Sequence, residues 1–301
     1  MPENGVPDFR AAPSALNLIQ DLGPLGELPG TWAGHGFNLI ARPDFQGGND
    51  IFLELNPTDE HLTFMAIGGA IPNRGSAMDD IELFGVHYLQ QISDDDTGGA
   101  IHTEPGVWIT VPATTKPEAP ATIARLATIP HGTAVLAQGS SSQIEGPLVF
   151  QPANTVPFGV GGHVPPPGTH NPFPEYNLAV ANKFRTTPTP TQVTQEAVTN
   201  PNSLLAAAIE HQTITSTVRL DVSTDAKAAT SGFGGAENIP FLRTNAEVAR
   251  VTAILWIETV QQPAPHSERT FMQLQYSQTV ILNFLGLSWP HVSVATLKKV
   301  T

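Results

Sequence analysis

Two long segments near the C-terminus, NAEVARVTAILWIETV (residues 245–260) and RTFMQLQYSQTVILNFLG (residues 269–286), decide the fold class. Both are rich in the β-branched and aromatic residues that favour strands. The segment between them, QQPAPHSE (residues 261–268), has the prolines and polar side chains typical of a turn. The two segments are therefore expected to pair as an antiparallel hairpin.

Shorter segments of the same kind recur from Gly30 onward, and some alternate cleanly, such as ATIARLATIP (residues 121–130). They follow one another without intervening helices, and an open sheet of about eleven strands would leave exposed edges. We therefore predict an all-β protein, an antiparallel closed β-barrel of about ten or more strands, folded as a single domain over residues 1–301. The other predicted strands are TWAGHGFNLIARP (31–43), DIFLELN (50–56), HLTFMAIGG (61–69), DIELFGVHYLQQIS (80–93), AIHTEPGVWITVPA (100–113), GTAVLAQGS (132–140), IEGPLVFQPA (144–153) and TITSTVRLDVS (213–223).

Two segments depart from this pattern. PSALNLIQDLG (residues 13–23) predicts a short N-terminal helix with Ser14 as its N-cap. Residues 154–245 begin with Pro-, Thr- and Gly-rich sequence and contain one helical candidate, SLLAAAIEHQ (203–212). We predict a long, loop-rich insertion with one short helix, because its aromatic residues indicate packing against the rest of the domain. A linker between two domains is the alternative.

The composition excludes several classes of function. The 301 residues include 14 Lys and Arg against 27 Asp and Glu, a formal net charge of −13, so nucleic-acid binding is not expected. The absence of cysteine excludes disulfides, thiolate metal sites and cysteine nucleophiles. No apolar run approaches 18 residues, and the N-terminus lacks a signal-peptide pattern. We therefore expect no membrane association and a cytoplasmic location.

Histidine is the main candidate for chemistry, since the chain has ten. None falls in a zinc spacing such as HExxH, and no GxSxG nucleophile elbow is present. By position alone, His102 is more simply a core or surface group of a strand, and His291 is more simply a structural residue. His131 lies in a turn beside Pro130 and Gly132, where we expect it to be exposed. The glycines of GTWAGHG (residues 30–36) leave one strand face bare, which suits either a tight barrel corner or the close approach of a ligand.

Both ends of the chain resemble the nitrobindin-like haem-binding proteins. LGPLGELPGTWAGHG (residues 22–36) is similar to the family's leader and first strand. AIHTEPGVWI (100–109) is similar to its His-Ala/Arg-Glu-x-Gly-aromatic strand, and ARLATIPHGTAVLAQG (124–139) to the hairpin that follows. MQLQYSQTVILNFLGLSWPHVSVATLKKV (272–300) is similar to its C-terminus, where a strand leads to a Pro-His pair and closes in a Leu-Lys/Arg pair.

The resemblance covers roughly residues 15–155 and 245–301, and it implies an antiparallel barrel that encloses haem b. His291, the residue after the proline, would be the axial ligand of ferric iron, in keeping with a chain that has no cysteine. A positioned base and a cation would be needed on the distal side for peroxide chemistry. We expect the haem to contact His291, Thr31, Trp32, Gly34, Met272 and Pro290, and from strand placement the distal candidates are His35, His102 and Arg125.

Two functions of different classes follow. The first is a haem protein, peroxidase-like or peroxynitrite-isomerase-like, that acts on peroxide, nitrogen-oxide species or an organic substrate in a pocket capped by the insertion. The alternative is a metal-free barrel that binds or carries an apolar small molecule. The expected partners are haem and a small ligand, and a homodimer stays open. The chain departs from the family in its greater length and in Asn38, which stands where the family has a further glycine.

Overall fold

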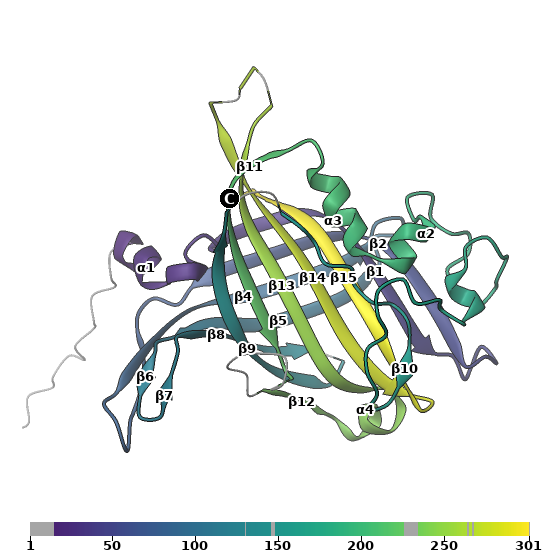
Figure 1. Ribbon diagram of the computed structural model, residues 1–301, viewed down its shortest axis with the longest axis horizontal. Helices are drawn as coiled ribbons and strands as arrows, with labels where there is room; N and C mark the ends of the chain where they lie inside the picture. Colours follow the sequence, from purple (N-terminus) through teal and green to yellow (C-terminus); the bar gives the residue numbers. More distant parts are fainter. Residues whose placement is uncertain are drawn as a thin grey trace, which may run out of the picture.

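The computed structural model describes residues 15–129, 131–145, 148–225, 234–263, 265–266 and 268–300. Ten strands of this described part form an antiparallel sheet that closes on itself, because β15 pairs with both β14 and β1 (Figure 1). The closed barrel and the predicted hairpin are therefore confirmed. Around the barrel, the strands are β1 (Gly30–Pro43), β2 (Ile51–Ala66), β4 (Ile81–Asp94), β5 (Ala100–Val111), β8 (Thr122–Ile129), β9 (Thr133–Ile144), β11 (Thr213–Ser223), β13 (Glu247–Gln261), β14 (Thr270–Phe284) and β15 (Leu287–Lys299).

Several short elements extend the barrel. The predicted N-terminal helix is confirmed as α1, although Ser14 lies outside the described residues. Within the described residues, no helix has the length and apolar character needed to cross a membrane. The short strands are β3 (Ile71–Asn73), β6 (Thr114–Thr115), β7 (Glu118–Ala119), β10 (Phe158–Gly159) and β12 (Gly235–Asn238), and the helices are α1 (Ala15–Asp21), η1 (Gly23–Leu25), η2 (Pro174–Tyr176), α2 (Gln195–Thr199), α3 (Asn202–Ile209) and α4 (Pro240–Asn245).

β2 joins two segments that the sequence predicts as separate strands. Pro57 lies in its middle, where a proline would normally remove a hydrogen bond of the ladder. Pairing with β4 begins only at the next residue, Thr58, and the Pro57 carbonyl accepts a bond from the N–H of Asp95, 3.0 Å away. The missing N–H thus falls at the end of the ladder, and the strand continues. By contrast, residues 148–153 of the predicted strand 144–153 lie outside any strand.

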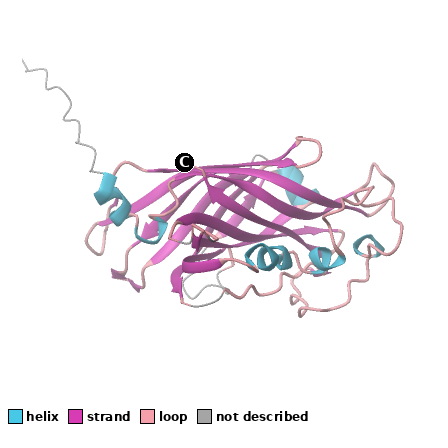
Figure 2. Cartoon of the chain, turned by 90° about the horizontal axis from the view of Figure 1, so that it is seen from above, coloured by secondary structure: helices cyan, strands magenta, loops and turns pink. Residues whose placement is uncertain are grey.

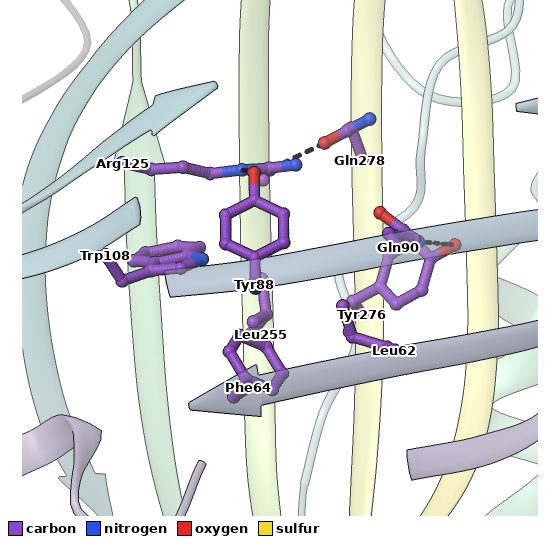
Figure 3. A pocket seen from close by; sticks show the side chains of 10 residues that line it. Leu62, Phe64, Tyr88, Gln90, Trp108, Arg125, Leu255, Tyr276 and Gln278 are labelled. Atoms are coloured by element: carbon purple, nitrogen blue, oxygen red, sulfur yellow. Dashed lines mark hydrogen bonds between the residues drawn. The ribbon is translucent and has the colours of Figure 1, made fainter. Parts of the chain in front are cut away.

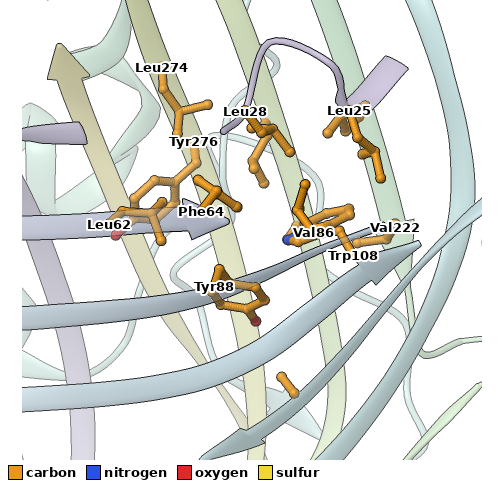
Figure 4. Packing of buried hydrophobic residues seen from close by; sticks show 14 of the residues in the cluster. Leu25, Leu28, Leu62, Phe64, Val86, Tyr88, Trp108, Val222, Leu274 and Tyr276 are labelled. Atoms are coloured by element: carbon orange, nitrogen blue, oxygen red, sulfur yellow. The ribbon is translucent and has the colours of Figure 1, made fainter. Parts of the chain in front are cut away.

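One end of the barrel is filled by side chains. The segment that follows α1 places Leu22, Leu25 and Leu28 against residues of the strands, among them Trp32 and Trp108. Figure 4 shows Leu25 and Leu28 beside Trp108. All five side chains are almost fully buried. The indole N–H of Trp32 donates to the Leu28 carbonyl at 2.8 Å, which satisfies the polar atom of an otherwise apolar plug.

The Pro-rich insertion lies on the outside of the barrel (Figures 1 and 2). Tyr176, Ala197 and Leu205 from the insertion pack with Leu39 and Val294, which face outward from β1 and β15. The Pro-rich part of the insertion therefore covers a wall of the barrel, whereas α4 (Pro240–Asn245), at the end of the predicted range, contributes Leu242 to the lining of an internal cavity. The predicted range 154–245 also contains β11, a strand of the barrel, and three short α-helices rather than one.

Candidate functional site

A cavity of about 390 Å³ lies inside the barrel near α4, away from the filled end. Leu242 of α4 and Ala246, which follows it, form part of its wall. The inward faces of the strands supply the rest, so both aliphatic and polar groups reach it. The aliphatic lining comes mainly from Ile40, Ile92, Ile101, Ile129, Val280 and Leu282, and the polar lining includes Asn38, Gln90, Tyr276, Gln278, His102, His131 and His291.

His291 is part of the cavity wall and lies on β15 opposite Val280. Its Nε2 is 2.6 Å from the carbonyl oxygen of Ala41 on β1. Because a carbonyl can only accept, Nε2–H is the donor and the lone pair remains on Nδ1. Burial lowers the pKa of His291 to about 4, although the bond to Ala41 favours the charged form. His291 is therefore a neutral imidazole at pH 7.

A buried ion pair lies beside the cavity. Glu104 on β5 pairs with Arg125 on β8, and Tyr88 donates to the same carboxylate. Arg125 also donates to the Tyr88 hydroxyl (2.8 Å) and to Oε1 of Gln278 (2.7 Å), as Figure 3 shows. Burial acts to raise the pKa of Glu104, but the Arg125 charge and the bonds from His102 and Tyr88 outweigh it and hold the pKa at about 2. Glu104 is thus a permanent carboxylate.

His102 connects this ion pair to the cavity. Its Nε2 lies 3.3 Å from Oε2 of Glu104, and because that carboxylate is ionised, Nε2–H is the donor of this bond. The His102 ring stacks on that of His131, with centroids 5.6 Å apart. Burial and the neighbouring His102 lower the pKa of His131. A histidine oriented by a buried carboxylate can accept or deliver a proton at the cavity wall.

A second buried carboxyl, that of Glu60 on β2, binds two groups that also line the cavity. Tyr276 donates to its Oε2 at 2.6 Å, and Gln90 donates to the same oxygen at 3.3 Å. Burial raises the pKa of Glu60 in spite of these bonds. Gly36 makes room for the carboxyl, because a Cβ at that position would lie 2.7 Å from Oε1 of Glu60. The glycine-rich first strand therefore serves close packing inside the barrel.

The structure brings together His102 and His291 of the predicted site, with Arg125 adjacent. His35 does not join them. It points outward from β1, its side chain is 75% exposed, and its Nδ1 lies 3.6 Å from a carboxylate oxygen of Asp95. Alternation along the strand puts Asn38 inside and His35 outside, so His35 cannot act as a distal group for a ligand at His291.

Four of the predicted haem contacts lie at the far end of the barrel. Trp32 pairs with Lys299, whereas Leu39 pairs with Val292, the neighbour of His291. At about 3.3 Å per residue, Trp32 is on the order of 20 Å from His291 along the wall. Thr31 and Gly34 share that end, and so does Met272, whose sulfur accepts a bond from Thr259.

Pro290 also lies apart from the cavity, since it borders a groove on the outer wall beside residues 151–154. Of the residues predicted to contact haem, only His291 lines this cavity.

Sequence reasoning missed the polar residues that surround the cavity. Tyr88 and Gln90, two residues apart, both lie on the inner face of β4, and Tyr276 and Gln278 have the same arrangement on β14. These residues could have been found from the sequence, because they place polar side chains two positions apart on a strand face that is expected to be apolar. Asn38, 2% exposed and noted only as a departure from the family, is another such residue.

Comparisons with known proteins add little. No protein-family model matches the chain, and no curated protein matches it. Among solved structures, the chain is similar to the crystal structure of Rv2717c from M. tuberculosis, with a TM-score of 0.43 and 15% sequence identity over 97% of this chain and 100% of that chain. The resemblance to nitrobindin-like proteins therefore stays a prediction.

Proposed function

We propose that this protein binds a small, largely apolar molecule inside the barrel. The observation that supports the proposal is the cavity of about 390 Å³, which falls in the range of small-molecule sites, within an interior that is otherwise filled. Its aliphatic lining would supply affinity at roughly 25 cal/mol per Å² of apolar surface removed from water. A few polar groups on the same wall would set orientation, as in most ligand sites.

Binding of N-phenyl-1-naphthylamine, a neutral dye whose fluorescence rises in apolar surroundings, tests this proposal. Val280→Trp fills the cavity from β14, and Val107→Trp, on the outward side of β5, is the matched control. We expect saturable binding in the wild type, about 10-fold weaker binding in Val280→Trp because of the lost volume, and no change in the control. Binding that both variants leave unchanged would rule out the cavity as the site.

A second candidate, haem binding, is favoured by His291. It is neutral, part of the cavity wall and held by a bond to a backbone carbonyl, the arrangement that orients metal-ligating histidines. Among the described residues, there is no cluster of three or more His, Asp or Glu that could hold a bare metal ion. Bound haem would supply an iron with one open position for a gas or peroxide, and His102, held by Glu104, would be the acid–base group at the same cavity.

The geometry of His291 makes haem binding the less favoured of the two candidate functions. The nitrogen that keeps its lone pair, Nδ1, is next to Cβ, so a flat macrocycle coordinated there would meet the strand. Coordination through Nε2 would require the ring to give up its bond to Ala41. A metal-free ligand needs neither change.

Hemin titration followed in the visible spectrum decides between the two candidates. Haem held by His291 would give a saturable Soret band that His291→Ala abolishes or shifts and that His61→Ala, on the exposed outer side of β2, leaves intact. If the wild type binds the dye but gives no specific Soret band, haem binding is excluded and the metal-free function is the one that remains.

A further inference from the structure

The side-chain oxygen of Asn38 is buried and has no partner among the described residues. Asn38 lies on β1 between Ser293 on one neighbouring strand and Asn56 on the other, is 2% exposed and lines the cavity. A buried amide oxygen without a hydrogen bond is destabilising, so its presence inside the barrel calls for a compensating contact.

The neighbouring polar groups at the cavity define what such a contact must be. His291 and His102 each donate their Nε2–H to protein, and Nδ1 of the neutral His291 ring is left as an acceptor. The Asn38 amide can turn about its last bond, so that either its N–H₂ or its oxygen faces the cavity. A hydroxyl is the small neutral group that satisfies both kinds of neighbour, because it accepts from an amide and donates to an imidazole nitrogen or a carbonyl oxygen.

Charge points to a neutral ligand. Glu104 is balanced by Arg125. Arg42, at the cavity edge, pairs with Glu54 at 2.6 Å and Asp44 at 3.2 Å. No charge on this part of the wall is left for a ligand charge to neutralise, and a buried charge without a partner is costly.

We propose that Asn38 is the specificity-determining residue of the cavity and that it selects neutral apolar molecules carrying a hydroxyl group, such as phenols. This inference rests on the proposed binding function and refines it. An analogue with a methyl in place of the hydroxyl would fill the same space without a hydrogen bond and leave the Asn38 amide unpaired.

Calorimetric titration with 1-naphthol and its near-isostere 1-methylnaphthalene tests the proposal. In the wild type, we expect 1-naphthol to bind roughly 10-fold more tightly, although it is the less apolar molecule. Asn38→Leu, similar in shape but unable to hydrogen-bond, should make 1-methylnaphthalene bind at least as tightly as 1-naphthol. Asn38→Ala serves as a second variant should the leucine disturb folding, and Asn73→Leu on exposed β3 is the control.

The outcomes separate this inference from the function on which it rests. Equal affinities in the wild type, or a preference that survives in both Asn38 variants, would overturn the role of Asn38, while binding sensitive to Val280→Trp would still support the cavity function. If neither naphthalene nor the dye binds the wild type, the binding function fails and the selectivity fails with it. A preference lost only in the Asn38 variants supports the proposal.

Discussion

The two walls of the barrel use their outer faces differently. On the covered wall, formed by β1, β13, β14 and β15, Trp256 and Val294 face outward and are buried beneath the insertion. On the open wall, formed by β4, β5, β8 and β9, Leu126 and Leu136 pair across neighbouring strands and remain about 40% exposed. Both walls have buried inner faces, so only the covered wall is buried on two sides.

This difference determines which side chains the strands of each wall can carry on their outer face. A strand buried on both faces reads as a nearly continuous apolar run, as VTAILWI (residues 251–257) does, whereas a strand with one solvent face alternates. Polar side chains on the outer face of the covered wall are shielded from water, so they can form hydrogen bonds only with other protein groups. Glu258 and Gln275 lie there, and each keeps one oxygen without a partner among the described residues.

The largest effect is expected at the contact between the covered wall and the insertion. Trp289 is 1% exposed, stacks on Phe284 with centroids 5.1 Å apart and lies 4.8 Å from the ring of Phe173 in the insertion. Trp289→Ala should lower the free energy of unfolding by close to 5 kcal/mol, from the lost burial and the cavity left behind. Urea unfolding measures this loss. Phe173→Ala removes only the insertion's ring and should cost less than half as much. Equal losses would mean that the insertion alone carries the contact.

A somewhat smaller loss is expected inside the open wall. Arg125→Met removes the partner of Glu104 and leaves a buried carboxylate uncompensated, which should cost roughly 4 kcal/mol. The double variant Arg125→Met/Glu104→Gln should recover much of the loss, because no buried charge remains. A double variant no more stable than the single one would assign the loss to packing, since the guanidinium also lies over the rings of Tyr88 and Trp108.

The same ion pair predicts acid sensitivity. The pKa of Glu104 is about 2 in the folded protein, below its usual value of 4.5, so the folded state favours the ionised form. The stabilisation is then complete above pH 4.5 and is lost as the pH falls from 4.5 towards 2. Glu104→Gln should lack this part of the acid-induced loss in unfolding experiments followed between these pH values.

Glu258, on the outer face of the covered wall, should behave in the opposite way. Its Oε2 accepts a bond of 2.6 Å from Gln273, but burial raises its pKa to about 7 against the effect of that bond. The folded state therefore holds the proton more tightly than the unfolded state, and stability falls as the pH rises from about 4.5 to 7. Glu258→Gln should be more stable than the wild type by at most roughly 3 kcal/mol above pH 7 and equal to it below pH 4.5. If Glu258→Gln and the wild type had the same free energy of unfolding both above pH 7 and below pH 4.5, the pKa of Glu258 would not be raised.

The fold could be predicted from sequence because the signal is local. Strands such as ATIARLATIP alternate, and the β13–β14 hairpin is long and bounded by a proline-containing turn, so a closed antiparallel barrel follows from the chain itself. The individual strands follow less well, because segments 50–56 and 61–69 form one strand and residues 148–153 form none. The position of the insertion could not be predicted in this way. Its contacts, such as Leu205 on Val294, join residues distant in sequence, and its composition indicates only that it packs on something.

The site could be predicted only in part, because its geometry also depends on contacts between residues that are distant in sequence. His291 was singled out by the resemblance to nitrobindin-like proteins and His102 by its place on a strand, and both line the cavity. Which way a side chain faces depends on register, and a shift of one residue moves it to the other side of the wall, as with His35 and Pro290. Distance along the barrel axis also depends on register, which is why Trp32 and Met272 lie at the wrong end.

The smallest effect is expected on the outer face of the open wall. Leu136→Thr replaces a half-exposed leucine on β9 by a residue that suits strands equally well, so the free energy of unfolding should change by less than about 0.5 kcal/mol. Urea unfolding at low protein concentration measures this change. A loss above about 1 kcal/mol, growing with protein concentration, would show that this face is covered in solution by a second copy of the chain, because binding to the folded state alone makes stability depend on concentration. The open wall would then be a second covered wall, with a partner subunit in the place of the insertion, and sedimentation of the wild type would give a dimer that Leu136→Thr weakens.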